Sequence, residues 1–515
     1  MPSVSRISEA AEASGALKKV NQAVQSYQIA RTDFVNAVQN ALKQQDGGVS
    51  LEGLMQGNIL ALLCCPLLQD PTAGIQIQAL AALGKLAAAN EAVASSISSC
   101  GILESVVSSL SHESAPIRVA AHSALQAIAS SSPENAQAVL ASGAMPALQA
   151  HLEAFEPAVK EAAVRTLNIF VDSSADMAEQ VLQQDAVSSL INNARSVDAA
   201  PGLQAAIAIT LGNACAWSPS LTAKVVDAGA IPVLCTLLQG RAVPATLKAA
   251  ALTCLSQVAQ HSEALAEEVA SYGVMPAALN ALTDAKSVVV RQSAASLVQQ
   301  VAHRSAQLAQ VVAIDGGAAC IVRGLELDMD RPAALSCVLA MGHIAGFQDT
   351  LARTVVEAGG CKALVQALQS PHPQVAAAAA WTVLQLAQGP DTAGPLAEQG
   401  ALGTLLDLYQ SAKDRNFKAK VKAALKQVIH QCKQLSALHP LVSASTPREL
   451  VRHVLYEFAQ VLPTAVEERR AFITCGAFMQ MQRLDCSEDA RAQQHRDTIN
   501  SLYPQAVVEY YGHQN

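Results

Sequence analysis

The stretch that decides the fold is residues 132–170, SPENAQAVLASGAMPALQAHLEAFEPAVKEAAVRTLNIF. Its first part predicts a short helix, because Ser132 can cap the amino end and Pro133 fits the first helical turn. Gly143 is expected to end that helix in a left-handed conformation, which costs glycine little. Two longer helices follow, each with one inward side at helical spacing. These sides hold Met145, Leu148 and Leu152 in the second helix, and Val159, Ala163, Thr166, Leu167 and Phe170 in the third.

This three-helix unit recurs along the chain. A glycine precedes an apolar helix at positions 57, 101, 143, 229, 273, 317, 360 and 400, and Asp185 takes the glycine position in one further unit. Successive spacings run from 40 to 44 residues, which excludes tetratricopeptide and ankyrin repeats and lies in the range of armadillo and HEAT repeats. HEAT units have two helices and these have three. We therefore predict an all-α, right-handed solenoid of armadillo repeats.

Composition agrees with closely packed helices. Of 515 residues, 51% are hydrophobic and only 3% aromatic, whereas β-sandwiches and barrels favour aromatic and β-branched residues. The net charge of −8 excludes a generally basic nucleic-acid binder. Charge is unevenly spread: residues 1–411 carry 20 basic and 32 acidic side chains, and residues 412–515 carry 14 basic and 10 acidic ones. The C-terminal piece is therefore the basic part of an acidic chain.

The pattern predicts three parts. Residues 1–50 are expected to form a polar N-terminus and a capping helix, whose apolar side holds Val24, Tyr27, Ile29, Phe34, Val35 and Val38. Residues 51–411 are expected to form an array of about nine armadillo units. Residues 412–515 are expected to form a basic helix, a degenerate last unit and an aromatic tail. Within this last part TPRE predicts a capping box, with Thr446 at the N-cap and Glu449 reaching back to it.

No catalytic constellation is found. The motifs HExxH and GxSxG and a complete P-loop are absent. The histidines do not pair at metal-ligand spacing, and the cysteines fall within apolar stripes. We therefore expect no enzyme, and no cofactor, metal or small-molecule substrate. The first residues lack the apolar core of a signal peptide, and the long uncharged runs contain proline, glycine or asparagine, so no membrane contact is expected.

The third helices are the first candidate surface for a partner. Nuclear-import armadillo adaptors hold lysine-rich peptides with a tryptophan and an asparagine four residues apart. Here Trp381 is followed by Gln385, and Asn213 is preceded by Ile209. No pair is intact, so a nuclear-signal adaptor is not expected. An adaptor for transport or assembly, which holds another peptide in its concave groove, stays open as the alternative.

The basic helix is the second candidate surface. Between 413 and 433 a single acidic residue, Asp414, accompanies seven cations: Lys413, Arg415, Lys418, Lys420, Lys422, Lys426 and Lys433. This pattern fits either a solvated helix face or contact with an acidic polymer. Only one aromatic residue, Phe417, could stack on a base, which favours an acidic protein surface over nucleic acid. The candidate partner-binding lysines are Lys418, Lys420, Lys422 and Lys426.

The C-terminal piece resembles the terminal signature of the sperm-associated antigen six family. The stretches that carry the resemblance are RELVRHVLYEFAQVLP at 448–463, VEERRAFITCGAFMQMQ at 466–482 and SLYPQAVVEYYG at 501–512. The segment YQIARTDFVNAV at 27–38 is similar to the family's N-terminal helix. Arg165 and Ala295 stand where the family's third helices usually carry tryptophan, which is typical of a diverged paralogue.

The resemblance implies a non-enzymatic structural scaffold of the central apparatus of motile cilia and flagella. Its implied location is the axonemal cytoskeleton, after a cytoplasmic stage before assembly. The implied partners are the microtubule and other central-apparatus proteins, including related armadillo proteins, with no nucleic acid and no membrane. Asn213, Trp381 and the tail residues Tyr510 and Tyr511 join the four lysines as candidate partner-binding residues.

Overall fold

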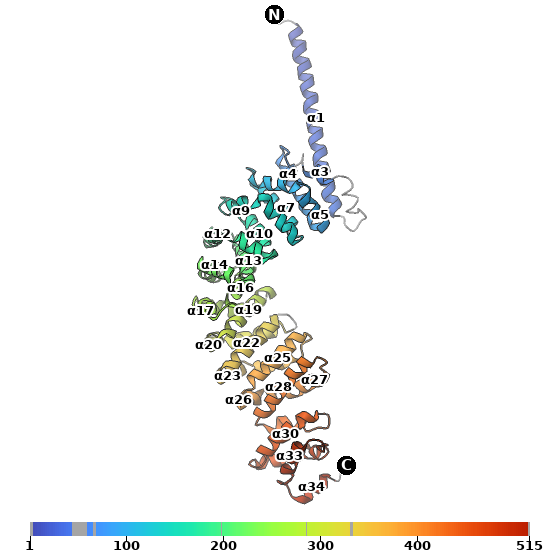
Figure 1. The fold of residues 1–515 in the computed structure, drawn as a ribbon, viewed down its shortest axis with the longest axis vertical. Helices are drawn as coiled ribbons and strands as arrows, with labels where there is room; N and C mark the ends of the chain where they lie inside the picture. The colour runs from blue at the N-terminus through green and yellow to red at the C-terminus, as the bar shows by residue number, and fades with distance from the viewer. Residues whose placement is uncertain are drawn as a thin grey trace. The chain divides into compact units, whose positions relative to one another are not determined.

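A computed structural model of the chain describes residues 4–43, 59–64, 68–196, 198–240, 242–284, 286–329 and 333–512. Within these ranges the chain forms helices, turns and bends, and no strand. It divides into two compact units, Met1–Val233 and Leu234–Asn515, and each unit contains successive three-helix repeats (Figure 1). Gly57, the first predicted corner, lies outside the described residues.

In the first unit each third helix packs on the third helix of the next repeat. These helices are α4 (Ala73–Ala89), α7 (Ala115–Ala129), α10 (Pro157–Ser173) and α13 (Pro201–Trp217). The first helices are α5 (Glu91–Ser99), α8 (Pro133–Val139), α11 (Ala175–Val181) and α14 (Pro219–Asp227). The second helices are α6 (Ile102–Ser108), α9 (Met145–Leu152) and α12 (Gln184–Arg195), and a short α3 (Ile59–Cys64) precedes α4. The second helix α15 (Ala230–Leu238) crosses the boundary of the units.

The second unit repeats this arrangement. Its third helices are α16 (Ala245–Ala259), α19 (Val288–Arg304), α22 (Ala333–Phe347), α25 (Pro373–Leu386) and α28 (Arg415–Gln431), again packed in order. The first helices are α17 (Glu263–Ser271), α20 (Ala306–Ala313), α23 (Asp349–Glu357) and α26 (Pro390–Glu398). The second helices are α18 (Met275–Leu282), α21 (Gly317–Leu327), α24 (Gly360–Leu368) and α27 (Ala401–Ser411).

The residues that shape the repeat behave largely as the quoted stretch predicts. The Ser132 hydroxyl accepts a hydrogen bond from the Asn135 backbone N–H at 3.3 Å and so caps α8. Gly143 is left-handed, with φ of 85°. Leu167 is fully buried in the middle of α10. Local capping and apolar spacing therefore predict the helices and the corner of one repeat correctly.

Two corners differ from the prediction by one residue. The left-handed glycines are Gly316 and Gly359, not Gly317 and Gly360. Gly317 is the first residue of α21, and a Cβ atom built there would lie 1.8 Å from the Val312 carbonyl oxygen. The first glycine of each pair therefore makes the turn, and at 316–317 the second permits the close approach of the two helices.

The N-terminal helix is longer than predicted, and among its described side chains only residues from Arg31 onward are buried or half-buried. α1 runs from Val4 to Lys43 and meets α4. Val35 and Val38 are buried there, and the Arg31 guanidinium pairs with the buried Asp70 carboxylate. The sequence predicts that Val24, Tyr27 and Ile29 belong to the packed apolar side of this helix. This prediction is wrong, because all three are exposed. The reason is length, because α1 continues past α4 within the first unit (Figure 1).

The C-terminal piece follows α28 with short helices. They are α29 (Leu435–Leu438), α30 (Arg448–Val461), α31 (Val466–Thr474), α32 (Ala477–Gln482), α33 (Ala490–Asn500) and α34 (Gln505–Gly512). The predicted capping box is wrong. Pro447 occupies the N-cap position of α30, and no side chain caps it. The Glu449 carboxylate instead contacts Tyr409 on α27 and Lys422 on α28. It is therefore used in a tertiary contact and not in the predicted cap of its own helix.

Aromatic residues that are scarce elsewhere gather inside this piece. Phe458 and Phe472 have ring centroids 4.6 Å apart, and Phe478 and Tyr503 have centroids 4.7 Å apart. The three phenylalanines are fully buried, and the Tyr503 hydroxyl donates a hydrogen bond to the Arg469 carbonyl at 3.1 Å. An aromatic cluster therefore forms the core of the C-terminal piece, where the alanine-rich packing of the repeats ends.

Candidate functional site

The predicted basic helix is α28, and part of its charge is used inside the protein. The Lys418 ammonium lies 4.6 Å from the centre of the Tyr409 ring on α27. The Lys422 ammonium pairs with one oxygen of Glu449 on α30, and the Tyr409 hydroxyl donates a hydrogen bond to the other. These contacts join α27, α28 and α30. Lys418 and Lys422 thus stabilise the junction between the last repeat and the C-terminal piece.

The electrostatics of this junction follow from the same contacts. The hydrogen bonds from Lys422 and Tyr409 lower the pKa of Glu449, because they favour its ionised form. The hydrogen bond to Glu449 raises the pKa of Tyr409 to about 12, because the phenol must stay protonated to donate it. The Tyr409–Glu449–Lys422 contact is consequently fully formed at neutral pH.

The remaining cations of the segment are more open to solvent. Lys413, Arg415, Lys420 and Lys433 are exposed. Lys426 is half-buried, and its charge lies near Glu449 and His453. The four predicted lysines therefore do not form one uniform surface. Of the four candidate lysines only Lys420 is exposed. Lys413 and Arg415 are also exposed, but the sequence analysis did not choose them as partner-binding residues.

A histidine cluster that the sequence did not suggest lies next to Lys426. The ring nitrogens of His430 on α28 contact Glu457 at 2.6 Å and His453 at 3.0 Å, both on α30. Burial raises the pKa of Glu457, although its hydrogen bond with His430 opposes the shift. Burial and the neighbouring cations lower the pKa of His453 to about 4. His430 is 23 positions from His453 and 27 positions from Glu457 in the sequence. No short sequence motif could therefore have revealed the cluster.

Asn213 is the candidate residue of the first unit, and its amide is directed to the neighbouring third helix. Its Nδ2 atom donates to Asn168 Oδ1 at 3.1 Å and to Asp172 Oδ1 at 3.3 Å, both on α10. Trp217, one turn further on, donates from its indole nitrogen to the Val171 carbonyl at 2.7 Å. Asn213 therefore lies in a polar row that links α13 to α10.

Trp381 is the candidate residue of the second unit, and it belongs to a row of rings on successive third helices. Its ring centroid is 4.9 Å from that of His343 on α22, which is 4.4 Å from that of His303 on α19. Burial and the nearby His303 lower the pKa of His343 to about 4. A row of rings therefore runs across α19, α22 and α25. Asn213 belongs to the first unit and Trp381 to the second.

The tail tyrosines lie on α34 and differ in environment. Tyr511 has its ring centroid 5.8 Å from that of Phe478 and so extends the aromatic core. Tyr510 is 61% exposed and meets only the edge of Tyr511 among the described rings. Of the two predicted residues, Tyr510 is therefore the one available to a partner.

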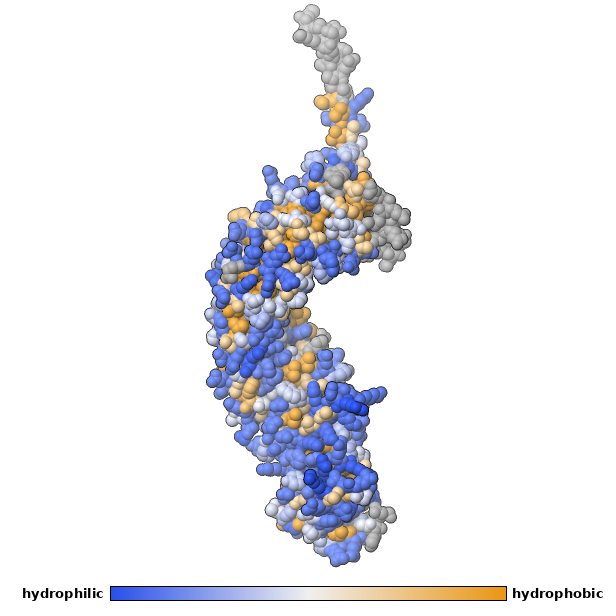
Figure 2. Space-filling model, in the orientation of Figure 1, coloured by the Kyte–Doolittle hydropathy of each residue, from blue (hydrophilic) through white to orange (hydrophobic). Residues whose placement is uncertain are grey.

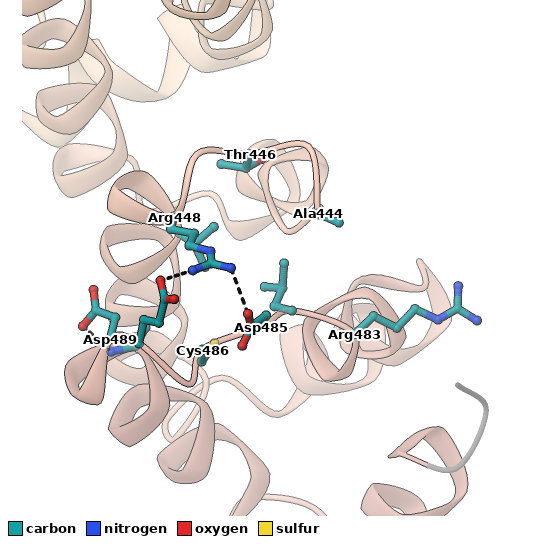
Figure 3. A pocket seen from close by; sticks show the side chains of 11 residues that line it. Ala444, Thr446, Arg448, Arg483, Asp485, Cys486 and Asp489 are labelled. Atoms are coloured by element: carbon teal, nitrogen blue, oxygen red, sulfur yellow. Dashed lines mark hydrogen bonds and ion pairs between the residues drawn. The ribbon is translucent and has the colours of Figure 1, made fainter.

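A pocket of about 190 Å³ opens beside the start of α30, and Figure 3 shows its lining. The Arg448 guanidinium contacts Asp485 at 2.9 Å and also pairs with Glu488 (Figure 3). Arg483 extends away from this group (Figure 3). The pocket's own charges are thus largely engaged with one another.

No metal-ligand group emerges from the part of the chain that the structure describes. No three His, Cys, Asp or Glu side chains there could hold a metal ion. Burial raises the pKa of Cys337 to about 12 and that of Cys361 to about 11, so these thiols are protonated at neutral pH. Among the described helices none alone is long and apolar enough to cross a membrane, while three sharply bent helix pairs meet that test by length and composition.

The fold and its glycine corners define an armadillo-repeat protein. The family described as Armadillo/beta-catenin-like repeat matches residues 351–388, which include most of α23 and all of α24 and α25. A crystal structure of an engineered protein superimposes with a TM-score of 0.65 at 20% identity, covering 86% of this chain and 98% of that one. This likeness concerns the fold alone.

Comparison with curated proteins gives a more particular relationship. The chain is 32% identical over 145 residues to sperm-associated antigen 6 of Homo sapiens, and equally to that of Mus musculus. Each match covers 28% of this chain and 28% of the relative. The chain is thus a diverged armadillo-repeat protein similar to sperm-associated antigen 6, and the resemblance seen in its sequence is confirmed.

Proposed function

We propose that the chain is a non-enzymatic scaffold of the central apparatus of motile cilia and flagella. It binds the microtubule wall and neighbouring axonemal proteins, and so supports motility. The observation that carries the ciliary assignment is the similarity to sperm-associated antigen 6, together with the terminal signature at 448–512. The scaffold role rests on the repeats, because stacked units offer a long series of side chains to extended partners.

The proposed microtubule contact is electrostatic and uses the exposed cations around α28. Lys413, Arg415 and Lys420 are exposed, and the only acidic residue among them, Asp414, accepts hydrogen bonds from the first backbone N–H groups of α28. These three cations are not paired with an acidic side chain of the same segment, so they can contact the acidic surface of a polymer. Lys418 and Lys422 contribute indirectly, because they hold α28 against α27 and α30.

Detergent extraction of purified cilia tests the scaffold role. A tagged copy of the chain should remain with the axoneme after the membrane and soluble matrix are removed. Complete release into the soluble fraction would contradict the scaffold. That result would favour the alternative, an armadillo adaptor that holds a partner peptide against the ring-lined row of His303, His343 and Trp381.

Charge reversal tests the contact surface. The variant Lys413→Glu, Arg415→Glu, Lys420→Glu should co-sediment with microtubules much more weakly than the unchanged chain, and added salt should abolish the difference because exposed charges are screened over about 8–10 Å. Lys85→Glu, Lys286→Glu, Lys362→Glu is the matched control, since all three lysines are exposed and lie on other repeats. Equal loss in both variants would show only a net-charge effect and would contradict a localised site.

A further inference from the structure

One serine precedes the exposed cations of the proposed microtubule contact. Ser411 is the last residue of α27, and its side chain is exposed. It is the only serine, threonine or tyrosine between residues 411 and 433, the segment that holds the seven cations. Figure 2 shows a mainly hydrophilic surface over α27 and α28 on the face in view. A modification that places negative charge on a hydroxyl of this segment therefore falls on Ser411.

The position of Ser411 leaves its hydroxyl accessible to an enzyme. α27 ends there, and residues 412–414 form no helix before α28 begins at Arg415. The Ser411 hydroxyl donates to carbonyl oxygens of its own last turn, those of Asp407 at 2.8 Å and Leu408 at 3.4 Å. In the described part of the chain it makes no hydrogen bond to another helix. Modification of Ser411 would thus break no contact between helices.

The residues after Ser411 indicate which kind of enzyme fits. Lys413 and Arg415 lie two and four positions after the serine, and both are exposed. The Asp414 carboxylate between them is used to accept hydrogen bonds from the backbone N–H groups that begin α28. Protein kinases select their substrates partly by charge pattern. The segment therefore suits a serine kinase whose acidic site binds basic residues on the C-terminal side of the acceptor.

A phosphate group on Ser411 would act on the neighbouring cations. It adds a charge of about −1.5 to −2 at neutral pH, with oxygens that pair readily with lysine and arginine. The carboxyl end of a helix repels an anion, and Ser411 ends α27, so the phosphate is directed away from that helix. Pairing with Lys413 and Arg415 leaves Lys420 as the only one of the three exposed cations that still offers an unpaired charge to an acidic surface.

We propose that Ser411 is a phosphorylation site whose modification releases the cations around α28 from an acidic polymer. This inference rests on the proposed microtubule contact and adds its regulation. In the reaction the Ser411 Oγ attacks the γ-phosphorus of ATP, and the bond from that phosphorus to the β,γ-bridging oxygen breaks. ADP leaves, and the hydroxyl proton passes to the catalytic base of the kinase.

Phosphate transfer tests the site itself. The purified full-length chain is incubated with ATP and a purified serine kinase that prefers a basic residue two positions after its acceptor, and mass spectrometry identifies the modified serines. Ser196 is the matched control, because it is exposed and directly follows the second helix α12, but Asp198 lies two positions after it. Ser411 should take up phosphate severalfold faster than Ser196. Equal or slower transfer to Ser411 would overturn the proposal.

Co-sedimentation with microtubules tests the switch. The chain phosphorylated at Ser411 should bind at least about threefold more weakly than the untreated chain at low salt, and high salt should remove the difference because exposed charges are screened over about 8–10 Å. Ser411→Ala, treated in the same way, should bind as tightly as the untreated chain. A phosphorylated chain that binds as tightly as the untreated one would be contrary to the switch.

Thermal melting separates an effect on charge from an effect on the fold. The phosphorylated and untreated chains should melt at the same temperature, since the Ser411 hydroxyl contacts only its own helix. Weaker binding together with a lower melting temperature would contradict a direct effect on the cations. If the untreated chain does not bind microtubules at all, the proposed contact fails and the switch fails with it, and phosphate found on Ser411 identifies that case as a failure of the contact and not of the modification site.

Discussion

At the scale of single residues, the third helices α22 and α25 pack so closely that a methyl group in place of one glycine hydrogen would clash. A Cβ atom built on Gly342 in α22 would lie 2.3 Å from the Trp381 ring and 2.6 Å from the Thr382 hydroxyl on α25. Glycine is thus what lets Trp381 sit half-buried between the two helices. The sequence analysis proposed Trp381 as a partner-binding residue. The structure shows that its ring also packs between two helices.

We expect Gly342→Ala to destabilise the second unit by about 1–3 kcal/mol, because Trp381 and Thr382 must move to admit the methyl group. Gly403→Ala is the matched control, since Gly403 lies within α27 and a Cβ atom there would meet nothing within 4 Å. That change should stabilise by up to about 1 kcal/mol through helix propensity. Thermal unfolding of both variants gives the comparison, and a Gly342→Ala chain that melts no lower than wild type would contradict the packing described.

At the scale of elements, buried polar contacts tie neighbouring repeats together. His122 on α7 is fully buried, with one ring nitrogen 3.0 Å from the Thr166 hydroxyl on α10 and the other 2.9 Å from a ring nitrogen of His151 on α9. The charged groups that face the pair are Arg118 on α7 and Glu156 before α10, which are joined at 2.8 Å. Burial is the main cause that lowers the pKa of His122, to about 3, with His151 and Arg118 adding to it.

This pair predicts acid sensitivity of the first unit. Between about pH 6.5, where an unfolded histidine titrates, and the folded pKa of about 3, the unfolded chain binds a proton that the folded chain does not. Stability contributed by His122 is therefore present above pH 6.5 and falls with decreasing pH, by up to about 1.4 kcal/mol per pH unit. Urea unfolding at several pH values should show a shallower pH dependence for His122→Gln than for wild type. Parallel curves for the two proteins would be the contrary result.

At the scale of the whole molecule, stability is built from contacts between neighbouring repeats. Each third helix in a unit packs chiefly on the third helices before and after it, as α10 does on α7 and α13. In such an array the loss of one contact is felt nearby and fades with distance along the chain. Function can then change at one repeat without loss of the fold at another.

Leu167→Ala tests this locality. Leu167 is fully buried in α10, so the change should leave a cavity that costs roughly 2–5 kcal/mol. Hydrogen exchange should become faster in α7, α10 and α13, while α25 in the second unit keeps its wild-type protection. An equal increase in both units would mean that the chain unfolds as one cooperative body.

The sequence by itself determined the repeat. The corner glycines, the serine cap at 132, the prolines in first turns and the inward face around Leu167 act over a few residues, so the printed sequence reveals them. It also revealed the similarity to sperm-associated antigen 6. It placed the corners at 316 and 359 one residue too late, because either glycine of a pair can adopt a left-handed conformation.

Only the tertiary structure decided which candidate side chains are exposed and which contact other helices. Glu449 leaves its predicted cap to meet Tyr409 and Lys422, which are 40 and 27 positions away. The lysines of α28 are therefore divided into half-buried ones that face neighbouring helices and exposed ones. The sequence likewise did not reveal the pairing of His430 with Glu457 or the exposure of Leu17, Val20, Val24, Tyr27 and Ile29 on α1. The physical reason is common to all three. A cap or an apolar stripe is set by neighbours along the chain, whereas the partner of a charged or apolar side chain is set by which helices the stacking brings beside it.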